Sequence, residues 1–368
     1  MESSPILSAA DARDRDAFID RIYDDAVGAF NIFAIHIGDR LGFYRELSKS
    51  SGLTSTQLAA RTGTQERYVR EWLEQQAAAC MLEVADGVAN PAERRFSLAP
   101  GRAEVLVDRD SLNFTAPLAQ LITGSVSPLD QVLRAYRDGG GVPFSGYGTN
   151  MREGQASMNR PMQLKQLGEE WIPTMADIHA RLLASPPALI ADIGCGAGWS
   201  SIGMARSYPR VIVHGYELDA ASVELARSNV AEAGLQERVQ IFLRDAKGAD
   251  LERRYDLVVA VECLHDMSDP VGVLQTMRGL LNENGAVMVV DERTLAAFQA
   301  CAETWEQILY GFSILHCLPA GMSEQPSAAT GTVMRSHTMQ RYAQEAGFQR
   351  VEILPIDHFF FRFYRLYA

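Results

Sequence analysis

The segment from Ala188 to Ser200, ALIADIGCGAGWS, has the residue types and spacing of a ligand-binding loop. Leu189 to Ile193 is a short apolar run typical of a buried parallel strand, and three glycines follow it before a helical segment begins. Glycines let the backbone turn tightly, and they leave main-chain N–H groups open to a ligand at the start of a helix. The sequence therefore predicts a strand, a glycine turn and a helix that bind a ligand together.

The spacing of these glycines discriminates between ligands. Gly194, Gly196 and Gly198 form the pattern G-x-G-x-G. The dinucleotide pattern G-x-G-x-x-G would need glycine or alanine at the position of Trp199, so dinucleotide binding is disfavoured. With Asp192 two residues ahead of the first glycine, the segment instead resembles the first motif of class I S-adenosylmethionine (SAM) methyltransferases.

Four further apolar segments follow in the order that this family shows. This order is not expected by chance, and the alternative is a doubly wound domain that has lost its ligand. The second ends at Glu217, where a carboxylate can accept both ribose hydroxyls. The third leads to Asp245, at the position where the family contacts adenine, and the fourth and fifth span residues 255–261 and 286–290. The resemblance implies SAM contacts, with S-adenosylhomocysteine (SAH) as the product, from Asp192, Gly194, Gly196, Gly198, Trp199, Glu217, Leu218, Asp245, Ala246 and Val261.

The loop after the fourth strand carries a candidate base. Methyl transfer from a sulfonium is a direct displacement, so a protein must align donor and acceptor and, for a hydroxyl acceptor, remove a proton. The segment from Leu264 to Asp269, LHDMSD, resembles the LHDWSD segment of dimeric small-molecule O-methyltransferases, with Met267 in place of their tryptophan. Their histidine is the catalytic base, and the resemblance implies this role for His265. The alternative is a histidine that only shapes the loop.

Three segments outside these motifs could bind the methyl acceptor. The glycine-rich residues 139–148 predict a loop that serves as a lid or substrate wall. Residues 153–183 predict a helix interrupted at Pro161 and Pro173, and residues 295–315 predict an aromatic-rich helix inserted before the last one. Packing in the core is the alternative for each side chain, and an aromatic lining would suit an uncharged or aromatic small molecule. The candidate acceptor contacts are Tyr147, Asn159, Trp171, Trp305, Phe312 and His316.

The N-terminal third predicts a winged helix. Residues 17–47 show helical spacing interrupted near Gly38 and Gly42, which predicts two or three helices after a frayed start at residues 1–15. Thr54 and Thr64 are suitable N-caps for two short helices separated by Gly63. Two short β-prone segments, residues 82–84 and 95–98, then predict a hairpin joined by the turn-forming residues 86–91.

A winged helix can bind DNA or form a subunit interface. Acidic residues outnumber basic ones over residues 1–110, and the second short helix mixes Arg67 and Arg70 with glutamates. A surface that reads DNA usually carries a basic stripe, so DNA binding is not expected. The apolar surplus of residues 17–47 predicts a homodimer instead.

Length and composition bound the remaining possibilities. The chain has 368 residues, of which 47% are hydrophobic, and its net charge of −12 disfavours nucleic acid. The five cysteines lack metal-binding spacing, which predicts reduced thiols and no metal. No apolar run reaches membrane-spanning length, which predicts a cytoplasmic protein without a membrane partner. We expect an N-terminal domain over residues 1–110, a helical linker and lid over 111–185, and a SAM-binding domain over 186–368 with an insertion at about 295–330.

The family resemblance extends over most of the chain. The segment MNRPM at Met158 to Met162, together with the winged helix, is similar to an actinobacterial group of winged-helix methyltransferases. The resemblance implies an α/β fold with a seven-stranded Rossmann-like sheet, an antiparallel last strand and an α-rich N-terminal domain. It favours O-methylation of a small molecule. The alternative is a SAM-sensing transcriptional regulator.

Overall fold

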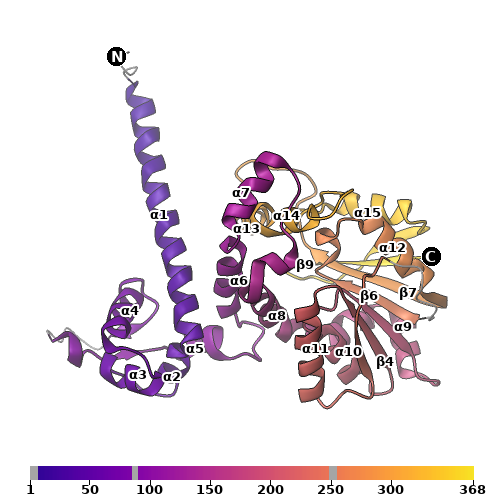
Figure 1. The fold of residues 1–368 in the computed structure, drawn as a ribbon, viewed down its shortest axis with the longest axis horizontal. Helices are drawn as coiled ribbons and strands as arrows, with labels where there is room; N and C mark the ends of the chain where they lie inside the picture. Colours follow the sequence, from indigo (N-terminus) through magenta and orange to yellow (C-terminus); the bar gives the residue numbers. More distant parts are fainter. Residues whose placement is uncertain (1–6, 85–89, 248–254) are drawn as a thin grey trace. The chain divides into compact units, whose positions relative to one another are not determined.

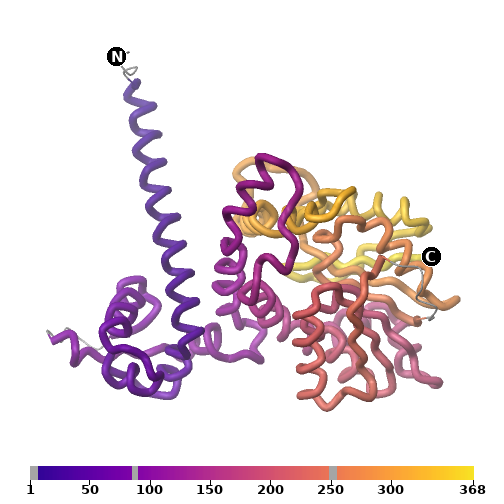
Figure 2. Tube along the Cα trace, in the orientation of Figure 1, coloured from indigo at the N-terminus to yellow at the C-terminus, as the bar shows by residue number. Residues whose placement is uncertain are grey.

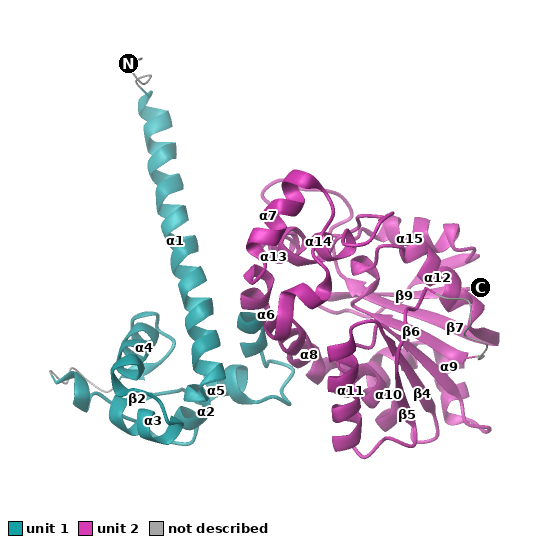
Figure 3. Ribbon diagram, in the orientation of Figure 1, with its two compact units in different colours: residues 1–120 teal, residues 121–368 magenta. Residues whose placement is uncertain are grey.

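A computed structural model describes residues 7–84, 90–247 and 255–368. The chain divides into two compact units, residues 1–120 and 121–368, which Figure 3 distinguishes by colour. None of the helices in these described ranges has the length and apolar character needed to cross a bilayer.

The first unit has the helix-turn-helix and hairpin of a winged helix. Thr54 caps the first of the two short helices by accepting a hydrogen bond from the Gln57 N–H, as the sequence predicts. The hairpin strands pair antiparallel, with Glu83 opposite Ser97, whereas residues 85–89 of the predicted turn lie outside the described residues. The elements are α1 (Ala9–Arg40), α2 (Phe43–Ser48), α3 (Ser55–Thr62), α4 (Glu66–Ala78), β1 (Glu83–Val84), η1 (Pro91–Glu93), β2 (Phe96–Ser97) and α5 (Pro100–Val107).

Helix α1 differs from the prediction of an early fray and a break near Gly38. The helix begins at Ala9, where the Ser8 side chain caps it, and it runs without a break through Gly38 (Figure 1). Glycine is needed at position 38 because a Cβ there would lie 2.3 Å from the Trp72 ring. The predicted break occurs at Gly42, which adopts a left-handed conformation with φ of 73°.

The second unit is built on a seven-stranded sheet of order β5-β4-β3-β6-β7-β9-β8. The first five strands in this order are parallel, and β9 pairs antiparallel with both β7 and β8. This is the sheet that the sequence predicts. The strands are β3 (Leu189–Ile193), β4 (Ile212–Glu217), β5 (Val239–Leu243), β6 (Tyr255–Val261), β7 (Leu281–Glu292), β8 (Arg350–Ile353) and β9 (Phe361–Tyr367).

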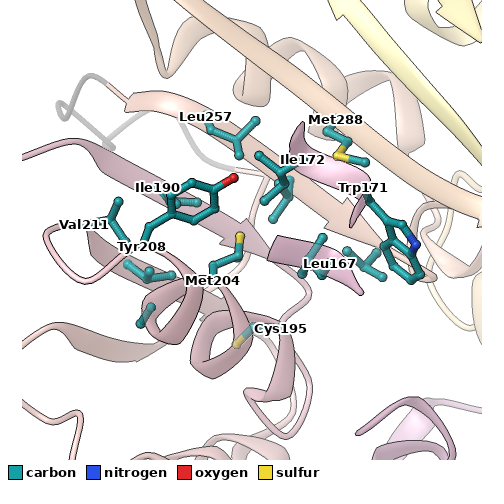
Figure 4. Close-up of a cluster of buried hydrophobic side chains, with 14 of the residues drawn as sticks. Leu167, Trp171, Ile172, Ile190, Cys195, Met204, Tyr208, Val211, Leu257 and Met288 are labelled. Atoms are coloured by element: carbon teal, nitrogen blue, oxygen red, sulfur yellow. The ribbon is translucent and has the colours of Figure 1, made fainter. Parts of the chain in front are cut away.

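Helices cover both faces of the sheet and bury two apolar clusters. One cluster packs α9 (Ala176–Leu183), α10 (Trp199–Ser207) and α11 (Ala220–Glu232) against one face, and Figure 4 shows part of it. The other packs α12 (Pro270–Gly279) and α15 (Ser336–Glu345) against the opposite face. Strands buried on both sides explain the near-continuous apolar runs in the sequence.

Helices also precede the sheet and follow its fifth strand (Figure 2). The predicted helix interruption at Pro161 is absent, because α8 continues through that residue. In the segment after β7, the helix starts at residue 304 rather than 295. These elements are α6 (Ala116–Val126), α7 (Leu129–Asp138), η2 (Phe144–Tyr147), α8 (Gly148–Lys165), η3 (Leu167–Trp171), η4 (Ile172–Thr174), η5 (Leu264–Asp266), α13 (Thr304–Phe312), η6 (Ser313–Cys317) and α14 (Leu318–Gly321).

Candidate active site

A cavity of about 570 Å³ lies at the carboxyl ends of the parallel strands. Its wall includes the segments that follow β3, β4, β5 and β6, together with one side of α8. The chain order reverses between β3 and β6, and such a switch point is where open α/β sheets bind ligands. The cavity lies within the second compact unit.

The glycine loop after β3 forms part of this cavity wall. Gly194 and Gly196 line the cavity, and both have positive φ, 65° and 51°. The hydroxyls of Ser200 and Ser201 each donate to Asp192 Oδ2 at 2.6 Å, which ties the strand end to the start of α10. Burial raises the pKa of Asp192 to about 6, although these hydrogen bonds oppose the shift. Asp192 therefore supports the loop from behind and does not line the cavity.

Gly198 also supports the loop rather than lining the cavity. It is the N-cap of α10, with φ of 79°, and a Cβ there would lie 3.2 Å from the Ala226 side chain. The remaining predicted cofactor contacts do line the cavity: Trp199, Glu217, Leu218, Asp245, Ala246 and Val261.

Glu217 is held by backbone donors at the end of β4. The N–H of Gly196 donates to its Oε2 at 2.9 Å, and the N–H groups of Leu218 and Asp219 donate to its Oε1, each at 2.8 Å. Burial raises the pKa of this carboxyl, and the three N–H donors oppose that rise. The carboxylate lines the cavity beside the glycine loop, so its two oxygens suit a pair of ligand hydroxyls such as those of a ribose.

Glu262 occupies the corresponding position after β6. Its φ of 55° lies in the left-handed region, which is costly for a residue other than glycine and is enriched at functional sites. Its N–H donates to the Val290 carbonyl at 2.7 Å, and the Asn159 side chain donates to its Oε2 at 2.5 Å. Burial raises the pKa of Glu262 to about 7. Both Glu262 and Asn159 line the cavity, and Asn159 is a predicted acceptor contact.

His265 lies behind the cavity wall, in a cluster of carboxylates. Its side chain is 2% exposed, with Nδ1 at 2.8 Å from Asp291 and 3.0 Å from Glu292, and Nε2 at 3.2 Å from Asp266. Burial opposes its charge, but these carboxylates outweigh burial and raise the pKa of His265 well above its ordinary value. Nδ1 thus faces Asp291 and Glu292, Nε2 faces Asp266, and His265 is not among the residues that line the cavity. The geometry therefore does not present it as a base to the cavity.

The same cluster contains two sets of potential metal donors. His265 lies with Asp291 and Glu292 in one set, and with Asp266 and Cys317 in the other, the donor atoms of each set lying within 4.8 Å. His265 Nδ1 donates to Asp291 Oδ1 at 2.8 Å, whereas its contacts with Asp266 Oδ1 and Glu292 Oε2 are close approaches without a hydrogen bond. His265 is the member that both sets share.

The predicted aromatic acceptor contacts do not line the cavity. Trp171 lies in the core, where Figure 4 shows it near Leu167 and Ile172, and its ring also packs against Phe361 and Phe363. Trp305 instead packs against Phe359 in a tilted arrangement and against Phe360 edge to face. Phe312 ends α13 away from the cavity lining.

Tyr147 and His316 form a layer behind the lining. The Tyr147 hydroxyl donates to the Leu315 carbonyl at 2.9 Å, and its ring meets the edge of His316 at a centroid distance of 4.5 Å. Burial lowers the pKa of His316. Phe144, which does line the cavity, packs against the same imidazole. The predicted loop thus reaches the cavity through Phe144 rather than through Tyr147.

Several cavity residues were not predicted from the sequence. Arg152, Gln155 and Gln163 recur with Asn159 at spacings of three or four residues, so they share one side of α8. Polar residues that recur at helical spacing are the sequence signal that could have identified them. Glu262 and Asp266 lie close to His265 in the sequence, but the sequence does not show which of the three faces the cavity.

Comparisons with known proteins agree with this architecture. Residues 188–347 match a family described as a methyltransferase domain, and residues 29–108 match one described as an Rv2258c-like winged HTH domain. The ubiquinone biosynthesis O-methyltransferase of Histophilus somni is 30% identical over 138 residues, which are 36% of this chain and 54% of that enzyme. Polyketide synthase ThaQ of Burkholderia thailandensis is 31% identical over 102 residues, 28% of this chain and 5% of the synthase. The chain thus spans about half the length of the first and a small part of the second.

Solved structures match nearly the whole chain at low identity. Mitomycin 7-O-methyltransferase MmcR has a TM-score of 0.67 at 20% identity, covering 97% of this chain and 99% of its own. PigF with SAH has a TM-score of 0.68 at 17% identity, covering 98% and 100%. Human N-acetylserotonin methyltransferase in complex with SAM has a TM-score of 0.66 at 15% identity, covering both chains fully. These likenesses show the fold, and the family matches place an Rv2258c-like winged helix-turn-helix domain before a methyltransferase domain in this chain.

Proposed function

We propose that the chain is a SAM-dependent methyltransferase that acts on a hydroxyl group of a small molecule. The observation that carries this proposal is Glu217, held by three backbone N–H groups beside the glycine loop at the switch point of the sheet. The residues fit SAM, because Glu217 suits its ribose hydroxyls, and Gly196 leaves the backbone open beside them. SAM supplies an electrophilic methyl group.

The chain's own residues would perform three tasks. Glu217 and the loop at Gly194 and Gly196 bind and orient the cofactor. The polar side of α8, with Asn159 and Gln163, and the apolar side chains of Phe144 and Met267 enclose the acceptor. A cavity carboxylate takes up the acceptor proton. Enclosure of the reacting groups excludes water and holds them in line.

Two measurements test this function. Isothermal titration calorimetry on the full chain should detect binding of both SAM and SAH, and a folded protein that binds neither would contradict the proposal. Incubation with SAM and a set of hydroxylated aromatic compounds should then release SAH together with a methylated product detected by mass spectrometry. Methylation only of amines or thiols would refute the hydroxyl specificity but not the methyltransferase activity.

We further propose that the protein is a homodimer formed through α1. This helix leaves large apolar side chains exposed, among them Tyr23 at 67% and Phe30 at 69%. Exposed apolar surface of this extent on one helix favours a protein partner, and a second copy of the chain supplies the same apolar side chains. Light scattering should give twice the chain mass for the wild type and a lower mass for Phe30→Glu. A monomeric wild type would refute the proposal.

DNA is not a proposed partner. The arginines of α4 are paired with glutamates, Arg67 with Glu71 at 2.5 Å and Arg70 with Glu66 at 2.8 Å, so the helix offers no uncompensated basic stripe. A sequence-specific gel shift that responds to SAM would favour the regulator instead. We place the reaction in the cytoplasm, because all five cysteines are free thiols.

A further inference from the structure

Glu262 differs from Asp219, Asp266 and Asp269, three other acidic residues of the cavity, in what contacts it. Asp219 pairs with Arg152 at 2.8 Å, and Asp269 pairs with Lys247 at 2.9 Å. Asp266 contacts the His265 imidazole. These carboxylates are therefore matched by cations. The contact that the structure gives to the Glu262 carboxylate is a neutral amide, that of Asn159.

The backbone holds Glu262 in place at an energetic cost. Its left-handed φ of 55° persists because its N–H is bonded to the Val290 carbonyl of β7 at 2.7 Å, which fixes the residue at the strand end. This conformation aims the residue at the cavity at the end of β6, next to the strand that carries the glycine loop. Glu262 lies on one side of β3, whereas Glu217 and Asp245 lie on the other side, at the ends of β4 and β5.

We propose that Glu262 is the group that accepts the proton of the methyl acceptor. This inference rests on the proposed function. The acceptor hydroxyl gives its proton to a Glu262 carboxylate oxygen as its own oxygen bonds to the methyl carbon. The electron pair of the breaking carbon–sulfur bond stays on sulfur. The products are a methyl ether, neutral SAH and a protonated Glu262, which then returns the proton to water.

The charged groups on the neighbouring elements determine the pH range in which Glu262 can accept this proton. Burial raises its pKa, the cation of His265 and the amide of Asn159 on α8 lower it, and Asp291 on β7 and Asp266 raise it. The resulting pKa of about 7 is where a general base is most effective at neutral pH. His265 is then a positioning residue, whose imidazole lies against Asp266, Asp291 and Glu292.

The test uses the charge difference between SAM and SAH, and it needs no acceptor. Both share the same ribose, amino and carboxylate groups, but SAM carries an additional positive charge on sulfur. A nearby cation favours an ionised Glu262, so at about pH 7 SAM should release up to about half a proton more on binding than SAH does. Calorimetry of the full chain in buffers of different ionisation enthalpy measures this difference directly.

Two variants make the test specific. Glu262→Gln should still bind SAH but should lose the difference in proton release. Glu224→Gln is the matched control, because Glu224 is a carboxylate on the exposed surface of α11, with a side chain 75% exposed. It should keep the full wild-type difference. If Glu262→Gln fails to fold, the SAM-to-SAH affinity ratio of the wild type should still rise between about pH 6 and about pH 8.

The outcomes separate this inference from the proposed function. Binding of both ligands with equal proton release in the wild type would overturn the role of Glu262 and leave the methyltransferase standing. The role of Glu262 is equally overturned if Glu262→Gln retains the wild-type difference or if the affinity ratio is constant with pH. Failure of both ligands to bind would instead refute the proposed function.

Discussion

Glu217 ends β4 and Glu262 follows β6, on either side of β3, and both line one cavity, yet they are held in different ways. Glu217 accepts three N–H groups from residues within its own loop and from the glycine loop beside it. Glu262 accepts from the side chain of Asn159, which lies 103 positions earlier in the sequence. Backbone donors suit a carboxylate that must stay fixed and accept hydroxyls. A side-chain amide and a nearby cation suit a carboxylate that must exchange a proton.

The largest effect on this comparison should come from removing the cation beside Glu262. His265→Ala would leave Asp291, Glu292 and Asp266 buried without their partner, and breaking a buried pair in this way costs about 3–5 kcal/mol of unfolding free energy. Chemical denaturation monitored by circular dichroism measures this loss. His337→Ala, at an exposed position of α15, is the matched control and should change stability little.

The pH dependence of this loss follows from the raised pKa of His265. A group whose pKa is higher in the folded state stabilises the protein fully below its unfolded pKa of about 6.5, and this contribution disappears as pH rises through the folded value. The difference between wild type and His265→Ala should therefore be greatest below about pH 6.5 and shrink at alkaline pH. A loss below about 1 kcal/mol at pH 6 would show that the cluster is not held by this cation.

The next largest effect is expected for Glu262→Gln, which should reduce turnover. Removing a general base typically lowers turnover by about 100-fold or more, so kcat on an acceptor found by screening should fall by that factor. The wild-type rate should rise with pH through about 7, where Glu262 loses its proton, and the variant should lack this inflection. Glu262→Asp should retain part of the activity. Near wild-type kcat in a folded Glu262→Gln protein would leave positioning alone as the source of catalysis.

The cofactor side could be predicted from the sequence because its signals are local. Gly194 and Gly196 sit in the same short segment as the strand that carries them, and Glu217 ends the next strand. Buried parallel strands also produce recognisable apolar runs, which predict the strands themselves, whereas the seven-stranded sheet was implied by the family resemblance. The winged helix was equally visible, because caps such as Thr54 act within one turn.

The acceptor side could not be predicted in the same way because it depends on contacts between distant residues. His265 carries the more recognisable motif, but Asp291 and Glu292 bury it, and only the fold reveals that Glu262 faces the cavity instead. Trp171 was predicted to contact the acceptor but lies in the core, because a large apolar side chain suits either place. The sequence likewise predicts a helix break near Gly38. The glycine is instead required by its close contact with Trp72, which lies far from it in the sequence.

Glu217→Ala should weaken SAM binding by about 2 kcal/mol, or roughly 30-fold. The variant removes the acceptor of two hydroxyl hydrogen bonds and leaves the N–H groups of Gly196, Leu218 and Asp219 without their carboxylate. Because the ribose is common to both ligands, SAM and SAH should lose equal affinity. Calorimetry checks both, and unchanged affinity in a folded protein would refute the ribose assignment. A loss confined to SAM would indicate that Glu217 faces the sulfonium.

Asn159→Ala should give the smallest effect and the sharpest distinction between the two carboxylates. The amide of Asn159 lowers the pKa of Glu262 by donating to its charged form, so its removal should make Glu262 harder to ionise. A single hydrogen bond of this kind contributes about 1 kcal/mol, and the pH midpoint of SAM-specific proton release should rise by about one unit. SAH affinity should change little, because Glu217 and the glycine loop are intact.

Recovery at high pH separates this electrostatic role of Asn159 from a structural one. If the amide acts through the ionisation of Glu262, raising the pH to about 9 should restore wild-type proton linkage and turnover, since the carboxylate is then charged without its help. Asn159→Gln, which retains an amide on α8, should lie between the wild type and the alanine variant. A defect that persists at alkaline pH would mean that Asn159 shapes the cavity wall or contacts the acceptor itself, and Glu262 would then be held in place by the Val290 bond and its strained backbone alone.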